Sequence, residues 1–458
     1  MTTVTSVPPR LTVRQNLAGL VAMRRDQVGF LRSAVREHGD IFRLRLGGFP
    51  MTVLNHPDYV QRVLVDNHAN YTKETFLYTA IRAILGDALL SHPGREPWKL
   101  RRKLLQPSFH RSSVATFTGS MAELTGQMLT RWERRHSDEP VDITSDVTDL
   151  ALKIVVRTLF GTDTGDRIVR FERDFHEVNG MTGDFFRFPF PPLTWPTPFN
   201  NRLRALVRSM NGFVDELIQQ RLNDEEGAAS EALGRQDFFT LLLHALDEES
   251  GSGLTRGELA NEVLGMVIAG YETSSNSISW ICHQLARHPD VQRRVQEEVD
   301  QVLGGRVPGF DDLAELTYTR MVIDETLRLF TPAWHTMRRA AEEDKIGGHR
   351  IRAGDSVYIN FFTLHRHPAF WPDPDRFDPG RFTAERNAER HRGAYQPFGS
   401  GPRHCIGKQL ALTELLLITA MISQSFHLEQ PAGAPHAGFA ALLTLQPKGG
   451  VHLHLRSR

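Results

Sequence analysis

The chain has 458 residues, enough for one large domain or several ordinary ones, and its 54 basic and 54 acidic residues give no net charge. This balance gives no reason to expect nucleic acid or an anionic membrane surface as a partner. Two cysteines exclude a disulfide framework and suit a reducing compartment. The polar N-terminus lacks the apolar core of a signal peptide, and no apolar run reaches the ~20 residues of a transmembrane segment. We therefore expect a cytoplasmic protein.

Strand patterns occur in two places along the chain. The first is near the N-terminus, where Ile41–Leu46 and Met51–Leu54 flank a glycine pair. The second is Lys345–Ile359, which is divided by turns at Gly347-Gly348 and at Gly354. Residues 1–30 are interpreted as an N-terminal extension.

Helical periodicity dominates from about residue 95 to residue 330. The longest predicted helix begins at Thr255, which forms a capping-box pair with Glu258, and continues to about Arg287. Further helices are predicted at Pro289–Leu303 and Tyr318–Leu329. The fold class is therefore mainly α with a small β part. No linker divides the chain, so we expect one domain over residues 1–458.

Two segments near the C-terminus depart from this periodicity. Pro368–Gln396 is rich in Pro, Asp and Arg, and so long an irregular segment is usually functional. Phe398–Gly407 (FGSGPRHCIG) is rich in glycine and precedes a predicted helix that starts near Lys408. The partial positive charge of a helix N-terminus and the nearby Arg403 favour a thiolate at Cys405, with a lowered pKa. Such a thiolate could be a nucleophile or a metal ligand. The alternative is a small, buried, apolar residue.

The residues around Cys405 favour the metal-ligand interpretation. Gly401 and Gly407 allow tight turns and close approach of the backbone to a ligand. Phe398 offers an aromatic face that could shield the sulfur, and backbone N–H groups after the cysteine could tune it. Arg403 could pair with an anionic group. Together these features suit a thiolate bound axially to a large, flat, anionic cofactor.

The run Phe398–Gly407 resembles the haem-binding loop of the cytochrome P-450 family, Phe-x-x-Gly-x-Arg-x-Cys-x-Gly, at every defining position. With three further signatures in the family's order, the resemblance covers about residues 30–455. It implies the cytochrome P-450 fold, with a long central helix over the haem and the cysteine loop beneath it. It also implies haem b with its iron bound by Cys405. The expected function is a monooxygenase that inserts one oxygen atom of O2 into a small hydrophobic substrate.

The first further signature is Glu325-Thr326-Leu327-Arg328. Glu325 and Arg328 share a helix face and can pair, although such pairs are common on solvated helices. The resemblance implies that this pair is buried and is joined by Arg381. We assign the three residues a structural role. Gly380 stands where the family commonly has an acidic residue.

The second signature lies inside the long helix. Gly270 costs ~1 kcal/mol there relative to alanine, and Ala269 and Gly270 together could let a ligand approach the backbone. Glu272 and Thr273 place a carboxylate and a hydroxyl beside them. The alternative is a polar face that packs on a neighbouring element. The resemblance implies an oxygen-binding groove in which this acid and this alcohol supply protons.

The third signature pairs Trp98 with Arg102 on one helix face. The resemblance implies that both hold a haem propionate, and that Arg339 and Arg403 occupy two more propionate-binding positions. The alternative is a solvated basic helix, which we expect to hold for Arg101 and Lys103.

The resemblance also suggests four residues of the substrate pocket: Phe76, Val267, Trp334 and Leu443. Ordinary core packing is the alternative for each. The aromatic and proline-rich stretch at residues 185–199 falls where the family has its mobile lid, and it suggests an apolar substrate, although it could equally be a packed loop. A terpene-like hydrocarbon, a fatty acyl chain or a secondary metabolite of similar character would fit.

About fifty residues follow Cys405, too few for a fused reductase, so electrons are expected from a ferredoxin or flavodoxin with an NAD(P)H-dependent reductase. A basic patch on the cysteine side could steer such an acidic partner, or it could be ordinary solvated surface. Its predicted members are Arg95, Lys99, Arg101, Lys103 and Lys408.

Other functions remain open from the sequence. A haem-thiolate peroxygenase or isomerase would not need the proton-supplying pair Glu272-Thr273. A non-catalytic haem-binding protein would not need the groove. A zinc site at His404 and Cys405 lacks further ligands in the sequence. Cys282 is interpreted as a packed thiol.

Overall fold

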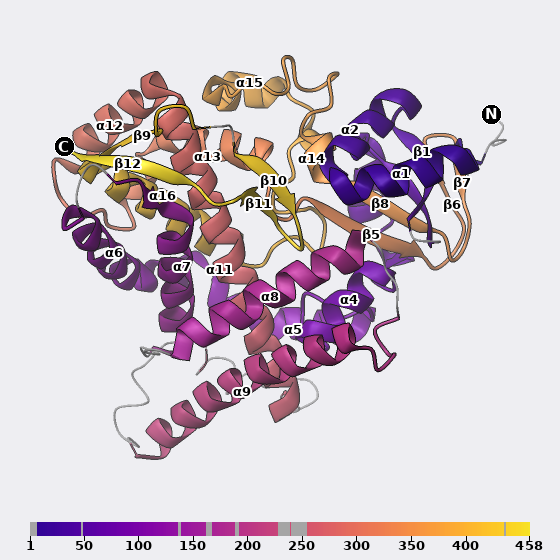
Figure 1. The fold of residues 1–458 in the computed structure, drawn as a ribbon, viewed down its shortest axis with the longest axis horizontal. Helices are drawn as coiled ribbons and strands as arrows, with labels where there is room; N and C mark the ends of the chain where they lie inside the picture. The colour runs from indigo at the N-terminus through magenta and orange to yellow at the C-terminus, as the bar shows by residue number, and fades with distance from the viewer. Residues whose placement is uncertain are drawn as a thin grey trace.

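The computed structural model describes residues 7–46, 49–135, 139–161, 167–187, 192–227, 239, 254–434 and 437–458. The fold is mainly α with small sheets, as predicted, and α11 passes through its middle (Figure 1). The helices are α1 (Val13–Arg25), α2 (Gln27–His38), α3 (Pro57–Gln61), α4 (Phe76–Leu85), α5 (Arg95–Leu105), α6 (Arg111–Glu133), α7 (Ile143–Phe160), α8 (Arg167–Arg187), α9 (Pro198–Gly227), α11 (Arg256–Arg287), α12 (Pro289–Leu303), α13 (Thr317–Leu329), α14 (Phe361–Leu364), α15 (Ala384–Glu389) and α16 (Lys408–Ser425).

The strands are β1 (Ile41–Leu46), β2 (Phe49–Leu54), β3 (Tyr71–Thr72), β4 (Val141–Asp142), β5 (His335–Ala340), β6 (Asp344–Ile346), β7 (His349–Ile351), β8 (Ser356–Asn360), β9 (Phe426–Glu429), β10 (Gly438–Ala441), β11 (Leu445–Lys448) and β12 (His452–Ser457). Short helical turns lie at η1 (Arg62–Asp66), η2 (His68–Asn70), η3 (Gln106–Phe109), η5 (Asp312–Ala314), η6 (Pro379–Phe382) and η7 (Arg392–Ala394).

The central helix α11 begins as the sequence predicts. The backbone N–H of Thr255 donates to Glu258 at 2.9 Å, and the backbone N–H of Glu258 donates back to the Thr255 hydroxyl at 3.3 Å, which completes the capping box. Helices α7, α13 and α16 pack around α11. Because it is covered on most sides, almost all of its length between Leu259 and Ala286 is buried.

The largest sheet has the strand order β1-β2-β8-β5-β3, in which β2 and β8 are parallel and the other pairs are antiparallel. It contains both predicted strand regions. Limiting the strands to those regions was wrong, because β9–β12 also form, and β12 pairs with β4 and β9. These strands are at most six residues long and β4 lies about 300 residues from β12, so tertiary pairing decides their state.

The N-terminal helices belong to the folded structure. Helix α1 lies within the segment that the sequence suggested as an extension, and Met23 on it is buried in the same core as Val28 and Phe42. The backbone of Leu11 donates to the carbonyl of Arg43 at 3.0 Å, which anchors the start of α1 to β1. Figure 1 shows α1 and α2 beside the largest sheet.

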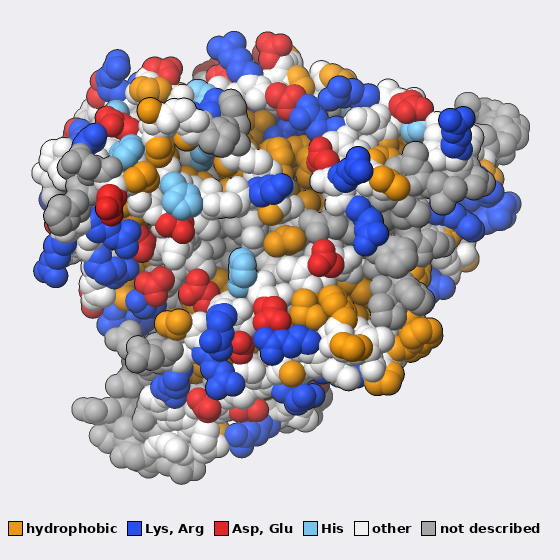
Figure 2. All heavy atoms as spheres, in the orientation of Figure 1, with side chains coloured by type: hydrophobic (Ala, Val, Ile, Leu, Met, Phe, Trp, Pro, Cys, Tyr) orange, Lys and Arg blue, Asp and Glu red, His pale blue; other side chains and the backbone are white. Residues whose placement is uncertain are grey.

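The surface shows no dominant charge on the face drawn in Figure 2. Lys and Arg are interspersed with Asp and Glu across it, in agreement with the zero net charge of the chain. Within the described residues, no helix combines the length and the apolar character needed to cross a bilayer.

Candidate active site

The loop before α16 is closed by backbone hydrogen bonds. The N–H of Cys405 donates to the carbonyl of Phe398 at 2.9 Å, and the N–H of His404 donates to the carbonyl of Gly401 at 3.1 Å. Gly401 has φ of 70°, and a Cβ there would collide with the carbonyl oxygen of Leu64, so only glycine fits. Gly407 has φ of −84°, so its backbone does not require glycine. A Cβ at Gly407 would stand 4.0 Å from the cysteine sulfur.

The thiol of Cys405 is free and accessible. Desolvation by the surrounding protein raises its pKa, and this effect outweighs the Gly407 N–H, Arg102 and Lys408, which lower the pKa. The predicted lowering of the pKa is therefore wrong. A metal ion that binds a thiol removes its proton in any case, so the raised pKa is compatible with a metal-ligand role.

One stripe of the otherwise buried helix α11 is accessible. Met266, Ala269, Gly270 and Thr273 are partly exposed, whereas their neighbours from Val263 to Ser277 are mostly buried. The spacing i, i+3, i+4, i+7 places these four on one helix face. The stripe contains three of the four residues predicted for the oxygen groove. Its apolar and hydroxyl-bearing surface can border a flat, largely apolar ligand.

Two contacts explain the sequence of the stripe. A Cβ on Gly270 would lie 2.9 Å from a methyl group of Val155, so glycine here also permits α7 to pack closely on α11. The hydroxyl of Thr273 donates to the carbonyl of Ala269 at 2.7 Å. This bond to the carbonyl one helical turn earlier holds the Thr273 hydroxyl at the accessible face of α11.

Glu272 lies off this stripe and is buried. Its Oε1 atom accepts hydrogen bonds from Asn179 Nδ2 at 2.9 Å, Asn276 Nδ2 at 3.3 Å, Thr444 Oγ1 at 2.8 Å and Gln446 Nε2. Burial raises the pKa of the carboxyl, although Thr444, Gln446 and Asn276 lower it. Within the described residues no hydrogen bond joins the Glu272 carboxyl to the Thr273 hydroxyl. The predicted pair therefore consists of one accessible alcohol and one enclosed acid.

A cluster of two buried cations and one partly buried cation lies near the cysteine loop. We call Lys73, Arg338 and Arg403 the cation cluster. Their positive charges lie close enough to interact: in addition to burial, Arg338 and Arg403 lower the pKa of Lys73, and Arg338 lowers the pKa of Arg403. Burial lowers the pKa of Lys73 to about 7 and that of Arg403 to about 10. In the part of the chain that the structure describes, none of the three forms an ion pair with a carboxylate. Apart from the hydroxyl of Tyr78, no acidic group in the described residues offsets these positive charges, so the cluster suits an anionic ligand.

Tyr78 connects two members of the cation cluster. Its hydroxyl lies 3.4 Å from an Arg338 nitrogen and 2.9 Å from the hydroxyl of Thr336, and Lys73 Nζ stands 4.6 Å from its ring centroid. Burial alone would raise the pKa of Tyr78, but Lys73 and Arg338 outweigh it and lower the pKa to about 7. No local sequence pattern places Lys73 and Tyr78 in this cluster, because only the tertiary fold brings them beside residues some 260 positions away.

Trp98, Arg102 and Arg403 meet at the cysteine loop. The Arg403 guanidinium lies 4.4 Å from the Trp98 ring and donates to the carbonyls of His92 and Gly94. Arg102 donates to the carbonyl of His404 at 2.7 Å. The structure thus brings together three residues that the sequence assigned to one cofactor.

The fourth residue assigned to the propionates, Arg339, is placed elsewhere. Successive residues of β5 point to opposite sides of the sheet, so Arg338 is buried in the cation cluster while Arg339 is exposed beside Gly354. The structure therefore places Arg339 outside the cation cluster and Arg338 within it. The two arginines are adjacent in sequence, and only the strand register separates them.

Two of the four predicted pocket residues belong to the core. Val267 and Trp334 are 0% and 1% exposed and pack in the core, so their role as pocket residues stays a prediction. Trp334 donates from Nε1 to the carbonyl of Leu442 at 3.2 Å, which fixes the turn between β10 and β11. Leu443 in this turn is partly exposed and stays a candidate.

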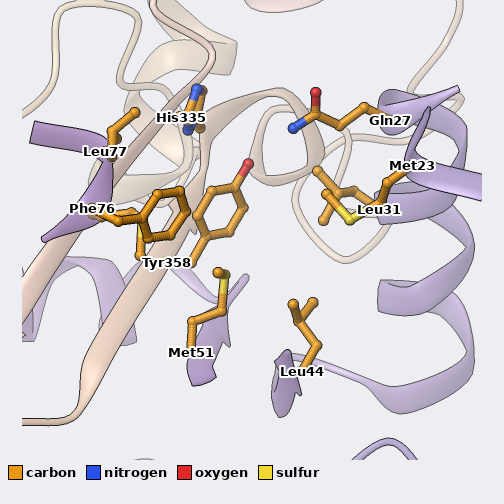
Figure 3. Close-up of a pocket in the computed structure, with 10 residues that line it drawn as sticks. Met23, Gln27, Leu31, Leu44, Met51, Phe76, Leu77, His335 and Tyr358 are labelled. Atoms are coloured by element: carbon orange, nitrogen blue, oxygen red, sulfur yellow. The ribbon is translucent and has the colours of Figure 1, made fainter. Parts of the chain in front are cut away.

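Phe76 lines a small separate cavity (Figure 3). The cavity lies among α1, α2, α4 and the largest sheet, and the Tyr358 hydroxyl and the Gln27 amide point into it together. Its volume of about 10 Å³ is that of one water molecule and is too small for a substrate.

The aromatic and proline-rich stretch is described from residue 192 onward, and residues 188–191 lie outside the described residues. Trp195 is 51% exposed, and apolar side chains gather at the lower right of Figure 2 over residues 192–199. Asn200 donates from Nδ2 to the carbonyls of Pro192 at 2.8 Å and Trp195 at 2.9 Å, so this loop is held in place from α9. Its role as a lid stays a prediction.

The predicted structural network is present. Arg328 donates to both carboxyl oxygens of Glu325 at 2.6 and 2.8 Å, and both side chains are fully buried. Arg381 on η6 lies 3.3 Å from the same carboxylate, and the backbone N–H of Asp378 donates to it at 2.8 Å. The network joins α13 to the irregular segment that precedes the cysteine loop.

The predicted basic patch is smaller than the sequence suggested. Arg101 is buried and pairs with Glu262 at 2.7 Å and Glu258 at 2.8 Å, so it is neither a solvated residue nor part of a docking surface. Lys99 is partly neutralised by Glu96 at 2.8 Å. Lys408 stays exposed at the start of α16.

Nothing in the described residues supports the zinc alternative. No group of three or more His, Cys, Asp or Glu side chains in the described ranges could hold a metal ion. His404 has one ring nitrogen 2.9 Å from the carbonyl of Gly401 and the other 3.1 Å from an Arg102 nitrogen, so its ring is already engaged. Cys282 is buried, and burial raises its pKa to about 12, as befits a packed thiol.

Comparison with known sequences agrees with this geometry. The sequence profile of the family described as Cytochrome P450 matches residues 6–453. A relative named cyclooctat-9-en-7-ol 5-monooxygenase, from Streptomyces melanosporofaciens, is 34% identical over 91% of this chain and 88% of its own length. Cyclooctatin synthase from the same organism is 33% identical over 89% of this chain and 87% of its own length. Pentalenene oxygenase from Streptomyces avermitilis is 32% identical over 86% of this chain and 85% of its own length.

Proposed function

We propose that Cys405 binds the iron of haem b, since the chain belongs to the cytochrome P450 family and its loop matches that family's ligand loop. Members of the family are haem-dependent monooxygenases, and this chain is one. When bound through a thiolate, haem activates dioxygen, because the thiolate favours O–O cleavage. The observation that carries the assignment is an accessible thiol beside a cluster of cations that form no ion pair with any carboxylate of the described residues.

The residues of the site fit such a group. The cation cluster would hold the two propionates, with Arg102 beside the cysteine loop and Trp98 supporting the Arg403 guanidinium. The accessible stripe of α11 would border the bound group, and Ala269 and Gly270 would leave room beside it for dioxygen and a substrate.

Replacing Arg338 with leucine should weaken haem retention, whereas the same change at Arg339 should not. Only Arg338 lies in the cation cluster. Loss of an outer-shell group of this kind typically costs about 10–100-fold in affinity. The rate of haem transfer to an excess of a haem-scavenging protein measures the effect. Equal transfer rates for the two variants would remove Arg338 from propionate binding.

We infer that Thr273 and Glu272 deliver protons. The Thr273 hydroxyl is held at the accessible face, and Glu272 is a buried acid with a raised pKa, able to carry a proton. The acid would need a small displacement or a water molecule to reach the alcohol, because the two side chains are not hydrogen-bonded to each other.

Replacing Thr273 with alanine should uncouple electron use from product formation. Without the hydroxyl, NAD(P)H consumption should continue while hydrogen peroxide increases at the expense of product. Thr273→Ser keeps the hydroxyl and is the matched control. Its ratio of product to NAD(P)H consumed should stay close to that of the parent. The ratio of product to NAD(P)H consumed is the measurement. Equal ratios in Thr273→Ala and the parent would take Thr273 out of the proton route.

Members of this family receive electrons from redox partners, and we propose a ferredoxin or flavodoxin for this chain. Charge reversal at Lys408 should slow reduction by such an acidic protein, most strongly at low salt. Lys448 on β11 is exposed and serves as the control. Stopped-flow reduction rates test this. A Lys408→Glu rate equal to that of Lys448→Glu at low ionic strength would contradict the proposed docking surface.

The substrate is proposed to be terpene-like. The three relatives reported above bear the names of cyclooctatin-type and pentalenene compounds, and the accessible stripe of α11 is largely apolar. Spectral titration with terpenes, fatty acids and macrolide precursors tests the substrate class through the spin shift caused by water loss. A shift with fatty acids alone would overturn the terpene assignment. A cytoplasmic location is also proposed, because both cysteines are free.

A further inference from the structure

A single buried asparagine links three elements around the predicted proton donor. Asn179 on α8 is 2% exposed, and its Nδ2 atom donates to Glu272 Oε1 at 2.9 Å. Its Oδ1 atom accepts the backbone N–H of Leu443 at 3.2 Å. One amide therefore connects α8, α11 and the turn between β10 and β11, with its donor and its acceptor both used.

The contact between α8 and this turn is close. One turn beyond Asn179, a Cβ on Gly183 would lie 2.6 Å from the side chain of Leu442. Trp334 holds the same turn from the other side through the carbonyl of Leu442. The turn carries Leu443, the pocket candidate that is still partly exposed.

The hydrogen bonds to the acid are unevenly distributed. All four donors to Glu272 end on Oε1, and within the described residues no hydrogen bond ends on Oε2. Because Oε1 is saturated as an acceptor, a proton on this carboxyl would sit on Oε2. The uncharged donors fix which oxygen can release it.

We propose that Asn179 is a positioning residue: it orients the Glu272 carboxyl and couples that carboxyl to α8 and to the turn at Leu443. The inference rests on the proposed role of Glu272 in proton delivery. A displacement of α8, for instance when substrate enters, would withdraw one donor from Oε1 and at the same time shift the turn beside the pocket. The acid and the pocket wall thus respond to one helix.

The surroundings of Glu272 determine the expected sign. His176 acts on its charge from α8, and Glu172 on α8 and Tyr271 on α11 are the other titratable groups close by, while the β10–β11 hairpin contributes the uncharged Thr444 and Gln446. The Asn179 amide stabilises the carboxylate form by donating to it. Removing that donor favours the protonated acid, so the pKa of Glu272 should rise.

The test is an infrared pH titration of the Glu272 carboxyl in the haem-loaded protein. Its C=O stretch is identified by subtracting the spectrum of Glu272→Gln. Asn179→Leu removes donor and acceptor at nearly constant volume. Asn179→Asp keeps the acceptor for the Leu443 N–H but replaces the donor with a carboxylate oxygen. The infrared band of the carboxyl that this variant introduces is removed by subtracting the spectrum of the double variant Asn179→Asp, Glu272→Gln. Both variants should raise the midpoint by about one pH unit or more, the size expected for one hydrogen bond to a charged group.

Asn201→Asp, on the exposed surface of α9, is the matched control and should leave the midpoint unchanged. Cooperative thermal unfolding shows which of the two Asn179 variants is folded. An unchanged midpoint of the Glu272 titration in a folded variant would overturn the inference. The proposed function is tested separately by the product ratio of Glu272→Gln. A shifted midpoint with normal coupling in Glu272→Gln would leave the positioning role standing and remove Glu272 from proton delivery. An unchanged midpoint together with uncoupled turnover in Glu272→Gln would remove the positioning role of Asn179 and leave Glu272 in proton delivery.

Discussion

Replacing Cys405 with serine should abolish product formation while the chain still folds and binds haem. A serine hydroxyl stays protonated at neutral pH, so the thiolate and its electron donation are lost. The cation cluster, Arg102 and Trp98 are untouched, so the propionate contacts should retain much of the haem. Removing the negative sulfur should also raise the reduction potential of the iron. Product yield, haem stoichiometry and spectroelectrochemistry measure these three effects.

Cys282 provides the matched control for this experiment. It is buried in α11, away from the accessible stripe, and its thiol is not a ligand in this account. Cys282→Ser should keep the spectrum and the coupling of the parent. Product formation that survives in Cys405→Ser would refute the ligand assignment, as would a changed ligand spectrum in Cys282→Ser.

Replacing Glu325 with alanine should cause the largest loss of stability of any single change considered. The variant leaves Arg328 buried without its carboxylate and removes the partner of Arg381. Breaking a buried ion pair from one side typically costs about 3–5 kcal/mol, a large fraction of the stability of an ordinary domain. The midpoint of urea unfolding measures the change.

Two controls separate burial from charge in this experiment. Glu325→Gln keeps the shape and one acceptor, so it should lie between Glu325→Ala and the parent. Glu177→Ala removes an exposed carboxylate that pairs with Arg202 and should change the midpoint little, because exposed ion pairs contribute little. Equal midpoints for Glu325→Ala and Glu177→Ala would show that the buried network does not hold α13 to the irregular segment.

Features that rest on local sequence were predictable. The start of α11 follows from the Thr255–Glu258 capping box, and the cysteine loop follows from its glycines, of which Gly399 and Gly401 have positive φ. The Glu325–Arg328 pair could be read from its i, i+3 spacing. In each case neighbouring residues determine the structure, so the pattern alone carries the information.

Features that depend on strand register, on the rotation of a helix about its axis or on contacts between distant segments were not predictable. The choice between Arg338 and Arg339 depends on the register of β5, and the exclusion of Val267 from the accessible stripe depends on the rotational phase of α11. Lys73 and Tyr78 reach Arg338 only through the tertiary fold. The enclosure of Glu272 likewise requires side chains from α8 and from β11, which no local pattern brings together.

The raised pKa of the Cys405 thiol shows a similar limit. Helix dipole and nearby cations argue for a lowered pKa, and both are visible in the sequence. Desolvation, which wins, depends on how much of the protein surrounds the sulfur. Sequence motifs therefore predict Cys405 as the ligand, while the electrostatic environment of its thiol could be described only from the structure.

The most direct test of the account is the difference spectrum of the reduced, haem-loaded protein with and without carbon monoxide. If Cys405 ligates the iron as a thiolate, the parent should show the strongly red-shifted band of thiolate-bound haem, and Cys405→Ser should lack it at equal haem content. A parent spectrum with the band position of histidine-ligated haem, or a red-shifted band that persists in Cys405→Ser, would contradict the central assignment.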